Sequence, residues 1–532
     1  MPDDRADVLV IGSGPAGAAA AKRLTDLGAK VVCLEQGDWV NPADFPSLRE
    51  DWETTLRRGP LHADPNVRKR PEDYPILAVG EVKSIQMFNG VGGTIWWDGY
   101  FPRFHPSDFR VRTLDGVGDD WPIDYKDLEP YYDMNDREVG VSGITGDPAN
   151  PPRSPRSTPP VALGAFGETM ARGFDKLGWY WWPADNAILS DFYDERPPCQ
   201  LHGKCLFGCV MSAKATPGTT YWPKALKKGA VLKTWCRVRE VTVDAQGRAR
   251  GAIYIDRQGN LHELLAKVVV VCCNGVGTPR LLLNSKSKLF PQGLANSSGM
   301  VGKNFMVHPF RYLEGVFDQP VHAEQGIPIP LLTQQFYETD LSRGFVRGYC
   351  LLAHGGFGPL HSAWGGSVGK PVAWGAEHHR SMRKCFLHTI RLALHGEDLP
   401  EEHNRVELDP ELKDSNGIPG ARVTYKHSDN SLKMLEHGTR MGRQAFEAAG
   451  AIEINVGTHL HDVAHLMGTA RMGSDPKRSV VNAWNQAHDV KNLFVVDGSS
   501  FTTCSAVNPT STIGALALRA AGGIWQRRRE WS

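Results

Sequence analysis

The sequence has no long hydrophobic run, no excess of charge of one sign and few cysteines for its 532 residues. No segment approaches the roughly 18 to 20 apolar residues that cross a bilayer, and the N-terminus has no signal-peptide pattern, so we expect a cytoplasmic protein without a membrane span. The formal net charge is +1, which gives nucleic acid no clustered Lys and Arg to bind. Ten cysteines in a chain of this length do not make a disulfide framework.

The composition is that of a globular protein, with 41% hydrophobic and 22% charged residues. A chain of this length exceeds one ordinary hydrophobic core, which predicts two or more packed domains. No internal repeat is present.

A nucleotide-binding pattern begins near the N-terminus. A β-branched run over 7–11 leads directly into Gly12-Ser-Gly-Pro-Ala-Gly17 and then into an Ala-rich stretch over 18–27. A second apolar run, over 30–34, ends in Glu35. This is the order strand, G-x-G-x-x-G, helix, strand, acid that binds dinucleotides.

Each residue type in this pattern has a physical role. Gly12 permits the tight turn, Gly14 lets the backbone approach a pyrophosphate, and Gly17 allows close helix–strand packing. The pyrophosphate is expected at the helix N-terminus, and Glu35 is expected to bind the ribose hydroxyls. The pattern alone does not separate NAD from FAD. The predicted cofactor contacts in this segment are Gly12, Gly14, Pro15, Ala16, Gly17, Glu35 and Gln36.

Four later segments complete a family pattern: Asn89-Gly-Val-Gly-Gly-Thr94 with Ile-Trp-Trp97, His465-Leu-Met-Gly-Thr-Ala-Arg-Met-Gly473, Asn492-Leu-Phe-Val-Val-Asp-Gly-Ser499, and Asn508-Pro-Thr-Ser-Thr512. With the N-terminal pattern they resemble the glucose–methanol–choline (GMC) family of flavoproteins. Within that family the chain looks most like bacterial FAD-dependent sugar dehydrogenases and pyranose-oxidising enzymes, and the stretch 116–132 supports that branch. The likeness runs from about residue 5 to 522 and is weakest between 311 and 400.

The resemblance implies an FAD cofactor and further contacts to it. Residues 90–94 should lie beside the flavin, the backbone at Val238 should hold the adenine, and the strand–turn–helix over 268–279 should complete the flavin sheet. Trp97 stands where some relatives carry a His bonded covalently to flavin, so we expect non-covalent FAD. The contacts implied are Gly90, Gly92, Gly93, Thr94, Val238, Asn274, Gly275, Asp497, Gly498, Pro509 and Thr510.

The resemblance also assigns catalytic residues. His465 aligns with the family's base and Asn508 with its partner, which hydrogen-bonds the same substrate oxygen. Imidazole suits removal of a hydroxyl proton while a hydride leaves the carbon for flavin, because its ordinary pKa near 6.5 leaves it mostly neutral. Arg471 and His308 are secondary polar candidates that we expect to be structural.

Three cysteines, Cys199, Cys205 and Cys209, have a spacing that could hold an iron–sulfur cluster, as related sugar dehydrogenases do. The chain has Gln200 where those enzymes have a second, adjacent Cys. We therefore favour a buried structural loop over a cluster, and no other metal site is predicted.

The predicted fold class is α/β, a Rossmann-like FAD-binding domain with an inserted α+β substrate domain on an antiparallel sheet. The FAD-binding domain is expected to be discontinuous. The predicted segments are 1–45, 80–150, 200–310 and 455–532 for the FAD domain, 46–79 for an excursion over the flavin, 151–199 for a linker and cap, and 311–454 for the substrate domain. Within these, 143–160 is Pro-rich and is expected to be an exposed linker.

The predicted function is FAD-dependent oxidation of an alcohol group on a sugar, glycoside or related polyhydroxylated compound, with an external electron acceptor or O₂. A dehydrogenase is favoured. One alternative is an oxidase using O₂ on a sterol or simple alcohol, and another is a non-redox FAD-containing lyase. The aromatic residues that suggest stacking on sugar rings are Trp179, Tyr180, Trp181, Trp182, Trp364 and Trp374.

Overall fold

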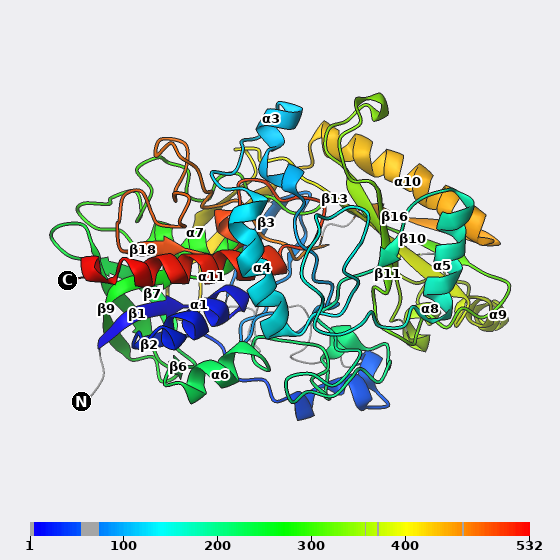
Figure 1. Cartoon of the computed structure of the whole chain (residues 1–532), viewed down its shortest axis with the longest axis horizontal. Helices are drawn as coiled ribbons and strands as arrows, with labels where there is room; N and C mark the ends of the chain where they lie inside the picture. Colours follow the sequence, from blue (N-terminus) through cyan, green and yellow to red (C-terminus); the bar gives the residue numbers. More distant parts are fainter. Residues whose placement is uncertain (1–4, 55–73, 357, 370–371, 460–461, 532) are drawn as a thin grey trace.

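The computed structural model describes residues 5–54, 74–356, 358–369, 372–459 and 462–531. The predicted excursion over 46–79 lies partly outside these ranges. Figure 1 shows two halves, with both chain ends in one half and a separate sheet backed by two helices in the other.

A seven-stranded sheet forms the half that contains both termini. Its strands, in spatial order, are β6 (Val231–Lys233), β2 (Val31–Leu34), β1 (Arg5–Ile11), β9 (Leu261–Val271), β8 (Ala249–Ile255) and β7 (Arg237–Val243), with β18 (Leu493–Val495) also on β9. The strands β6, β2, β1, β9 and β18 run parallel, while β7 and β8 form an antiparallel extension. The parallel strands are runs of buried Val, Leu and Ile, as expected for a sheet covered on both faces.

Helices cover this sheet and connect its strands. The helix α1 (Pro15–Asp26) links β1 to β2 and packs against α11 (Thr510–Gln526), so the beginning and end of the chain lie side by side (Figure 1). The helix α4 (Tyr125–Val139) packs on α11, and α7 (Asn274–Asn284) follows β9. This is the predicted βαβ nucleotide-binding unit, within a residue or a few of the expected bounds.

The second large sheet is antiparallel. Its order is β16 (Glu453–His459), β10 (Phe310–Val316), β13 (Thr389–Gly396), β12 (Tyr349–His354), β11 (Leu331–Phe336) and β5 (Trp182–Pro183). The helices α5 (Gly164–Lys176) and α10 (Asp429–Ala449) pack together behind it. Leu313, Leu392 and Phe446 are buried in the layer between sheet and helices. The prediction of an antiparallel sheet backed by helices is confirmed.

Two smaller sheets and several short helices join the halves. The small sheets are β14 (Arg405–Lys413), β15 (Pro419–Tyr425) and β3 (Ile76–Gly80), and separately β17 (Asp462–Val463) with β4 (Ser84–Ile85). The remaining helical turns are η1 (Pro42–Asp44), η2 (Pro46–Leu48), η4 (Pro106–Phe109), α3 (Val111–Asp115), η5 (Cys205–Phe207), α6 (Tyr221–Lys227), η6 (Leu341–Arg343), α8 (Pro359–Ala363), α9 (Ala376–Cys385), η7 (Gly498–Ser500) and η8 (Arg528–Trp531). None of the helices in the described part of the chain has both the length and the apolar character needed to cross a bilayer.

The segment 143–160 is irregular, as expected, and many of its residues are exposed, but Gly143, Asp147, Arg153 and Thr158 are buried. The Arg153 side chain is fully buried, with its guanidinium 2.6 Å from Asp147 and 3.0 Å from Asp185. Arg156 pairs with Asp185 at 2.8 Å and also with Asp136. Prolines predict the lack of regular structure, but ion pairs to distant residues hold the segment against the body.

The division into domains stays a prediction, which we now propose with the strand pairing in view. Residues of the predicted cap supply α5 and β5 of the antiparallel sheet, and β3 from the predicted excursion pairs with β15. The predicted cap and the predicted substrate domain therefore share the antiparallel sheet, and the predicted boundary between residues 454 and 455 falls inside β16.

Candidate active site

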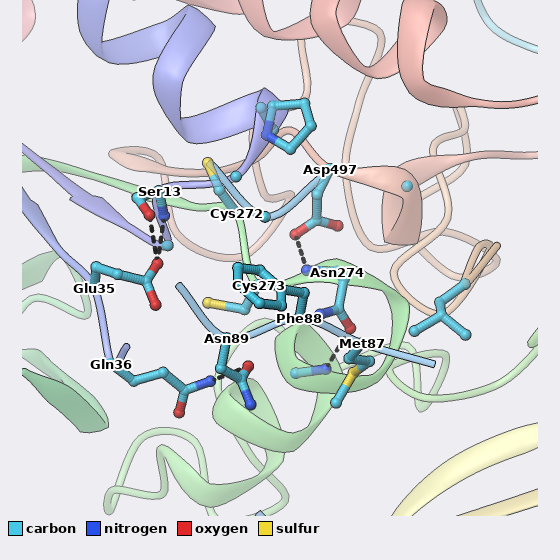
Figure 2. A pocket seen from close by; sticks show the side chains of 18 of the residues that line it. Ser13, Glu35, Gln36, Met87, Phe88, Asn89, Cys272, Cys273, Asn274 and Asp497 are labelled. Carbon is cyan, nitrogen blue, oxygen red and sulfur yellow. Dashed lines mark hydrogen bonds between the residues drawn. The ribbon is translucent and has the colours of Figure 1, made fainter. Parts of the chain in front are cut away.

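A cavity of about 330 Å³ lies where the parallel strands of the first sheet end. Its walls come from the segments that follow β1, β2, β9 and β18, together with the loop over 86–97. The carboxyl ends of parallel strands are where α/β sheets bind their ligands. Figure 2 shows side chains from these separate segments around one space.

The glycine-rich turn has the geometry that its pattern predicts. Gly12 has φ +96°, in the region that favours glycine. A Cβ at Gly17 would lie 1.9 Å from the Gly12 carbonyl oxygen, so no larger residue fits between α1 and β1. A Cβ at Gly14 would meet nothing within 4 Å, and Gly14 lines the cavity at the start of α1. The free N–H groups of α1 therefore face open space, as a pyrophosphate requires.

Glu35 lies at the end of β2 and is held in place by its neighbours. Its carboxylate accepts hydrogen bonds from Ser13 N (2.9 Å) and Ser13 Oγ (2.6 Å) (Figure 2). It also accepts one from Gly37 N (2.8 Å). A carboxylate can accept about four, so one position remains for a ribose hydroxyl. The adjacent Gln36 donates to Asn89 at 2.6 Å, which ties the end of β2 to the 86–97 loop.

The predicted flavin loop packs directly on the glycine-rich turn. A Cβ at Gly93 would lie 3.0 Å from Gly14 Cα. Gly90, Gly93 and Thr94 line the cavity. Gly92 lies behind them and packs against Gly218 instead, with φ +98°.

The Asp497 carboxylate holds the start of α7 and accepts as many hydrogen bonds as a carboxylate can. Asp497 accepts from Asn274 N (3.0 Å) and Thr278 Oγ1 (2.6 Å), and from Ser499 through its N (2.8 Å) and Oγ (2.5 Å). These four bonds use its acceptor capacity, so the side chain positions the cavity wall. Asn274 has φ +67° and lines the cavity. Gly275 packs against Leu466 instead, since a Cβ at Gly275 would lie 2.4 Å from the Leu466 carbonyl carbon.

The remaining predicted cofactor residues line the same cavity: Pro15, Ala16, Val238, Gly498, Pro509 and Thr510. Of the predicted set, Gly17, Gly92 and Gly275 stand behind the wall. Their role is to allow segments to approach closely.

His465 and Asn508 both line the cavity, although they are far apart in the chain. His465 lies in the loop after β17, and Asn508 lies just before α11. The cavity thus combines the glycine-rich turn with the predicted base and its predicted partner.

Backbone pairing brings a second histidine to His465. Met306 and Met467 exchange two backbone hydrogen bonds, of 3.0 and 3.1 Å, as an isolated antiparallel bridge. His308 lies two residues after Met306, and His465 lies two residues before Met467. The two imidazole rings therefore face each other, and their Nδ1 atoms are 2.8 Å apart. The expectation that His308 is structural stays a prediction, and its direct contact with the predicted base gives it a positioning role.

The direction of each hydrogen bond follows from one carbonyl. His308 Nε2 lies 3.1 Å from the Ser505 carbonyl oxygen, which can only accept, so Nε2 carries the proton. Nδ1 of a neutral His308 is then an acceptor, and His465 Nδ1 donates to it. His465 Nε2 is left with its lone pair available.

Burial keeps both rings neutral. It lowers the pKa of His465 to about 4, against the opposing effect of the Asp98 carboxylate. Burial also lowers the pKa of His308 well below its ordinary value, and the neighbouring His465 adds to this. At neutral pH His465 is therefore ready to accept a proton.

Trp97 and a buried lysine shape one side of the cavity. The Trp97 indole lines the cavity and donates to the Ala215 carbonyl at 3.2 Å. Lys214 Nζ donates to the carbonyls of Ile95 (2.8 Å), Trp97 (2.8 Å) and Cys205 (2.7 Å). Lys214 thus holds the cavity loop against the cysteine-containing loop.

Two of the three cysteines, Cys205 and Cys209, contact this lysine. Cys199 Sγ accepts from Leu201 N at 3.4 Å, and Cys209 Sγ accepts from Lys214 N at 3.5 Å. Burial raises the pKa of Cys205. These contacts support a packed structural loop, which remains our prediction.

Sequence reasoning missed a charged group at the far end of the cavity. Arg237 and Arg280 both line it and share Asp414, at 3.2 and 2.8 Å. The Arg280 guanidinium also stacks over Tyr74 at 4.6 Å. Arg280 lies on the same helix as the predicted contacts Asn274 and Gly275. This proximity in sequence is the signal that could have pointed to Arg280.

The aromatic residues predicted to stack on sugar rings lie elsewhere. Trp374 is 96% exposed, Trp364 is 47% exposed, and Trp182 is buried in β5. Within the described chain, the tryptophans that line the cavity are Trp96 and Trp97. Arg471 pairs with Asp119 at 2.7 Å, which fits its expected structural role.

The cavity fits FAD by its own geometry. It offers an uncovered helix N-terminus, a carboxylate with a free acceptor position, and open space beside Gly14, where a side chain would block a ligand. These are the features that a bound dinucleotide needs.

Family models match three parts of the chain. The GMC oxidoreductase N-terminal model matches residues 164–310, the GMC oxidoreductase C-terminal model matches 400–517, and an FAD binding domain model matches 7–43.

Curated proteins match along nearly the whole chain. The 2-methyl-1,2-propanediol dehydrogenase of Mycolicibacterium austroafricanum is 45% identical, covering 98% of this chain and 96% of its own. The fructose dehydrogenase large subunit of Gluconobacter japonicus is 30% identical, covering 98% and 97%. The 6'''-hydroxyparomomycin C oxidase of Streptomyces lividus is 30% identical, covering 97% and 91%.

Solved structures share the fold. Pyridoxine 4-oxidase from Mesorbium loti superposes with a TM-score of 0.62 at 17% identity, covering 97% of this chain and 98% of that one. An R554K variant of the Aspergillus oryzae formate oxidase superposes with a TM-score of 0.64 at 15% identity, covering all of both chains.

Proposed function

Because the chain belongs to the GMC oxidoreductase family, we propose that it oxidises a hydroxyl group of a small polyhydroxylated compound, with His465 as the base. Membership makes it an FAD-dependent oxidoreductase that acts on CH–OH donors. The observation that carries the role of His465 is the hydrogen-bond chain from the Ser505 carbonyl through His308, which leaves His465 Nε2 unprotonated at the cavity.

The chain's own residues handle the proton. His465 Nε2 takes the hydroxyl proton of the substrate, and its Nδ1–H stays bonded to His308, so the ring does not turn as its charge changes. The Asp98 carboxylate favours the resulting positive charge, since it raises the pKa of His465 against burial. The side-chain amide of Asn508 donates a hydrogen bond to the same substrate oxygen. FAD, when bound, supplies the hydride acceptor.

The residues proposed to hold FAD are those that line the cavity. The turn Gly12–Ala16 and the N-terminus of α1 bind the pyrophosphate, Glu35 binds the ribose, and the Gly90–Thr94 loop lies by the flavin. Trp97 has no nucleophilic nitrogen for a covalent link, so acid precipitation of the protein should release all of its flavin. An iron assay on the same sample should find no stoichiometric iron at the three cysteines.

The proposed substrate class is a sugar, glycoside or small diol. The relatives include a dehydrogenase named for a diol and one named for fructose. Because the predicted stacking tryptophans lie away from the cavity, they give no reason to prefer a sugar ring over a diol. We also propose that the enzyme is a dehydrogenase and not an oxidase. Turnover should then be negligible with O₂ alone and should appear when an artificial dye is added as electron acceptor.

Replacing His465 by Ala tests the proposal. The rate of flavin reduction by substrate under anaerobic conditions should fall about 10²- to 10⁴-fold, because a positioned base contributes this much. FAD content should stay at one per chain. The measurement is stopped-flow bleaching of the flavin absorbance over a panel of sugars, glycosides, diols and simple alcohols.

His262→Ala is the matched control, because His262 is a half-exposed residue on β9 that pairs with Asp256. It should reduce flavin at the wild-type rate. If His465→Ala did so as well, His465 would not be the base. If no hydroxyl compound bleached the wild-type flavin, oxidation itself would be contradicted and the lyase alternative favoured.

A further inference from the structure

Three histidines from separate elements converge beside the cavity: His308 before β10, His395 on β13 and His465 after β17. One ring nitrogen from each lies within 4.8 Å of the other two. The ring centroid of His308 is 4.0 Å from that of His395 and 4.8 Å from that of His465. The hydrogen-bond chain from Ser505 to His465 uses only two of these rings.

His395 is the unexplained member. It is fully buried, with 0% exposure, and neither of its ring nitrogens has a hydrogen-bond partner among the described residues. Burying a polar group without a partner is unfavourable, so a buried imidazole whose two nitrogens have no partner points to a ligand that would bind them. The side chain packs against His308, with its ring centroid 5.5 Å from that of His465.

We propose that His308, His395 and His465 together bind one divalent transition-metal ion of the Zn²⁺ class. Neutral imidazole is a common ligand of such ions, and three protein ligands with an open fourth position form a stable site. Metal–nitrogen bonds of about 2.0–2.1 Å place tetrahedral ligand atoms about 3.3 Å apart. The observed span of 4.8 Å and the 2.8 Å contact bracket this value, so small rotations of the rings complete the site.

The surroundings provide the outer support that such sites use. His308 Nε2 donates to the Ser505 carbonyl at 3.1 Å, which fixes the ring and leaves Nδ1 for the ion. A backbone carbonyl on the far nitrogen of a ligating histidine is a common arrangement in metal sites. His465 lines the cavity, so a water or anion can take the fourth position from that side.

Metal binding is incompatible with the base role of His465, and this consequence rests on the proposed function. Coordination through Nδ1 leaves the ring proton on Nε2, facing the substrate. Coordination through Nε2 occupies the lone pair itself. In either case His465 cannot accept the hydroxyl proton, so the metal-bound enzyme is inactive and a chelator restores it.

Titration calorimetry with Zn²⁺ on the chelator-treated FAD holoenzyme tests the site. Wild-type protein should bind one ion, and His395→Leu should bind it at least about 100-fold more weakly, because changes to residues outside the ligand set already cost about 10- to 100-fold. His379→Leu, which removes an exposed histidine on α9, should keep the wild-type stoichiometry. Flavin reduction should be inhibited by Zn²⁺ in the wild type and in His379→Leu, reversed by EDTA, and resistant in His395→Leu.

His395→Phe keeps a ring of similar shape and provides a second variant if His395→Leu does not retain FAD. Equal Zn²⁺ binding by the wild type and by either folded His395 variant would overturn the proposal. The two proposals fail separately. Zinc binding at His395 without any hydroxyl oxidation contradicts the proposed function alone, whereas oxidation by a protein that binds no zinc at His395 contradicts the metal site alone.

Discussion

At the scale of single residues, the buried ammonium group of Lys214 holds the cavity wall formed by residues 95–97. Lys214 is 1% exposed and donates to three carbonyls from two loops. Burial lowers its pKa to about 8. Its function is to join the Ile95–Trp97 backbone, beside the cavity, to the loop that contains Cys205.

Replacing Lys214 by Met should destabilise the protein and weaken FAD binding. The apolar side chain leaves three buried carbonyl oxygens without this donor, and each costs about 1 to 3 kcal/mol, so the free energy of unfolding should fall by about 3 kcal/mol or more. Thermal unfolding monitored by flavin fluorescence measures both effects.

The matched control is Lys228→Met. The Lys228 side chain is 61% exposed and forms a surface ion pair with Asp26 at 3.2 Å, which contributes little. A Tm for Lys214→Met as close to wild type as that of the control would contradict the bracing role.

The proposed base can be found from the sequence, but its environment cannot. The glycines that flank His465 and the Asn508 segment are enough to single it out. Nothing in the sequence tells that Met306 pairs with Met467 and so turns His308 toward His465. The direction of the protons depends on that pairing.

At the scale of elements, β1 and α1 pack so closely at Gly17 that no side chain fits between them. Gly17 sits where any side chain would overlap the Gly12 carbonyl. This close approach is what places the N-terminus of α1 at the cavity.

Gly17→Ala should therefore force α1 away from β1, with a loss of about 1 to 3 kcal/mol and of most bound FAD. Gly522→Ala in α11 is the control, since a Cβ there meets nothing within 4 Å and α11 packs on the same helix. It should be neutral or raise the stability by up to about 1 kcal/mol, because Ala is the better helix former. FAD per chain and Tm are the measurements. Retention of full FAD by Gly17→Ala would show that the two elements can separate without loss of the site.

Elements with a strong local pattern are predicted well. The β1–α1–β2 unit has a continuous apolar strand, a glycine turn and an Ala-rich helix, and all three form where expected. For the segment 143–160, only the irregularity follows from the sequence. The burial of the Arg153 and Arg156 side chains depends on Asp136 and Asp185, whose positions relative to them are set by the tertiary fold.

At the scale of the whole molecule, one buried carboxyl group connects three separate segments near the site. Asp398 accepts from Tyr425 Oη (2.9 Å) on β15, from Ser431 Oγ (3.2 Å) on α10 and from Val307 N (3.4 Å) beside the histidine cluster. Burial raises its pKa to about 7. The neighbouring Glu397, which pairs with Arg347, has its pKa raised to about 8, also by burial.

Asp398 should make the protein less stable as pH rises. Below an unfolded pKa near 3.8 both states hold the proton, and the stabilising contribution is complete. Between there and about 7 only the folded state holds it, so the contribution is lost progressively and is gone above the folded pKa. Each pKa unit corresponds to about 1.4 kcal/mol.

Asp398→Asn removes this titration, while Glu397 and the buried histidines titrate in both proteins. As pH rises from about 5 to about 8, the Tm of the wild type should therefore fall relative to that of the variant. A difference that stays constant over this range would show that Asp398 is ionised in the folded protein throughout.

Short patterns in the chain suffice for the nucleotide-binding unit, the family and the choice of His465, because the residues of each pattern act on one another locally. The groups that surround His465 follow only from the folded molecule. His308, His395 and His465 come from three different elements, and Ser505 comes from a fourth. Their meeting depends on backbone pairing between distant segments, β10 with β13 and Met306 with Met467, and this pairing is set by the summed packing of many side chains that no short pattern records.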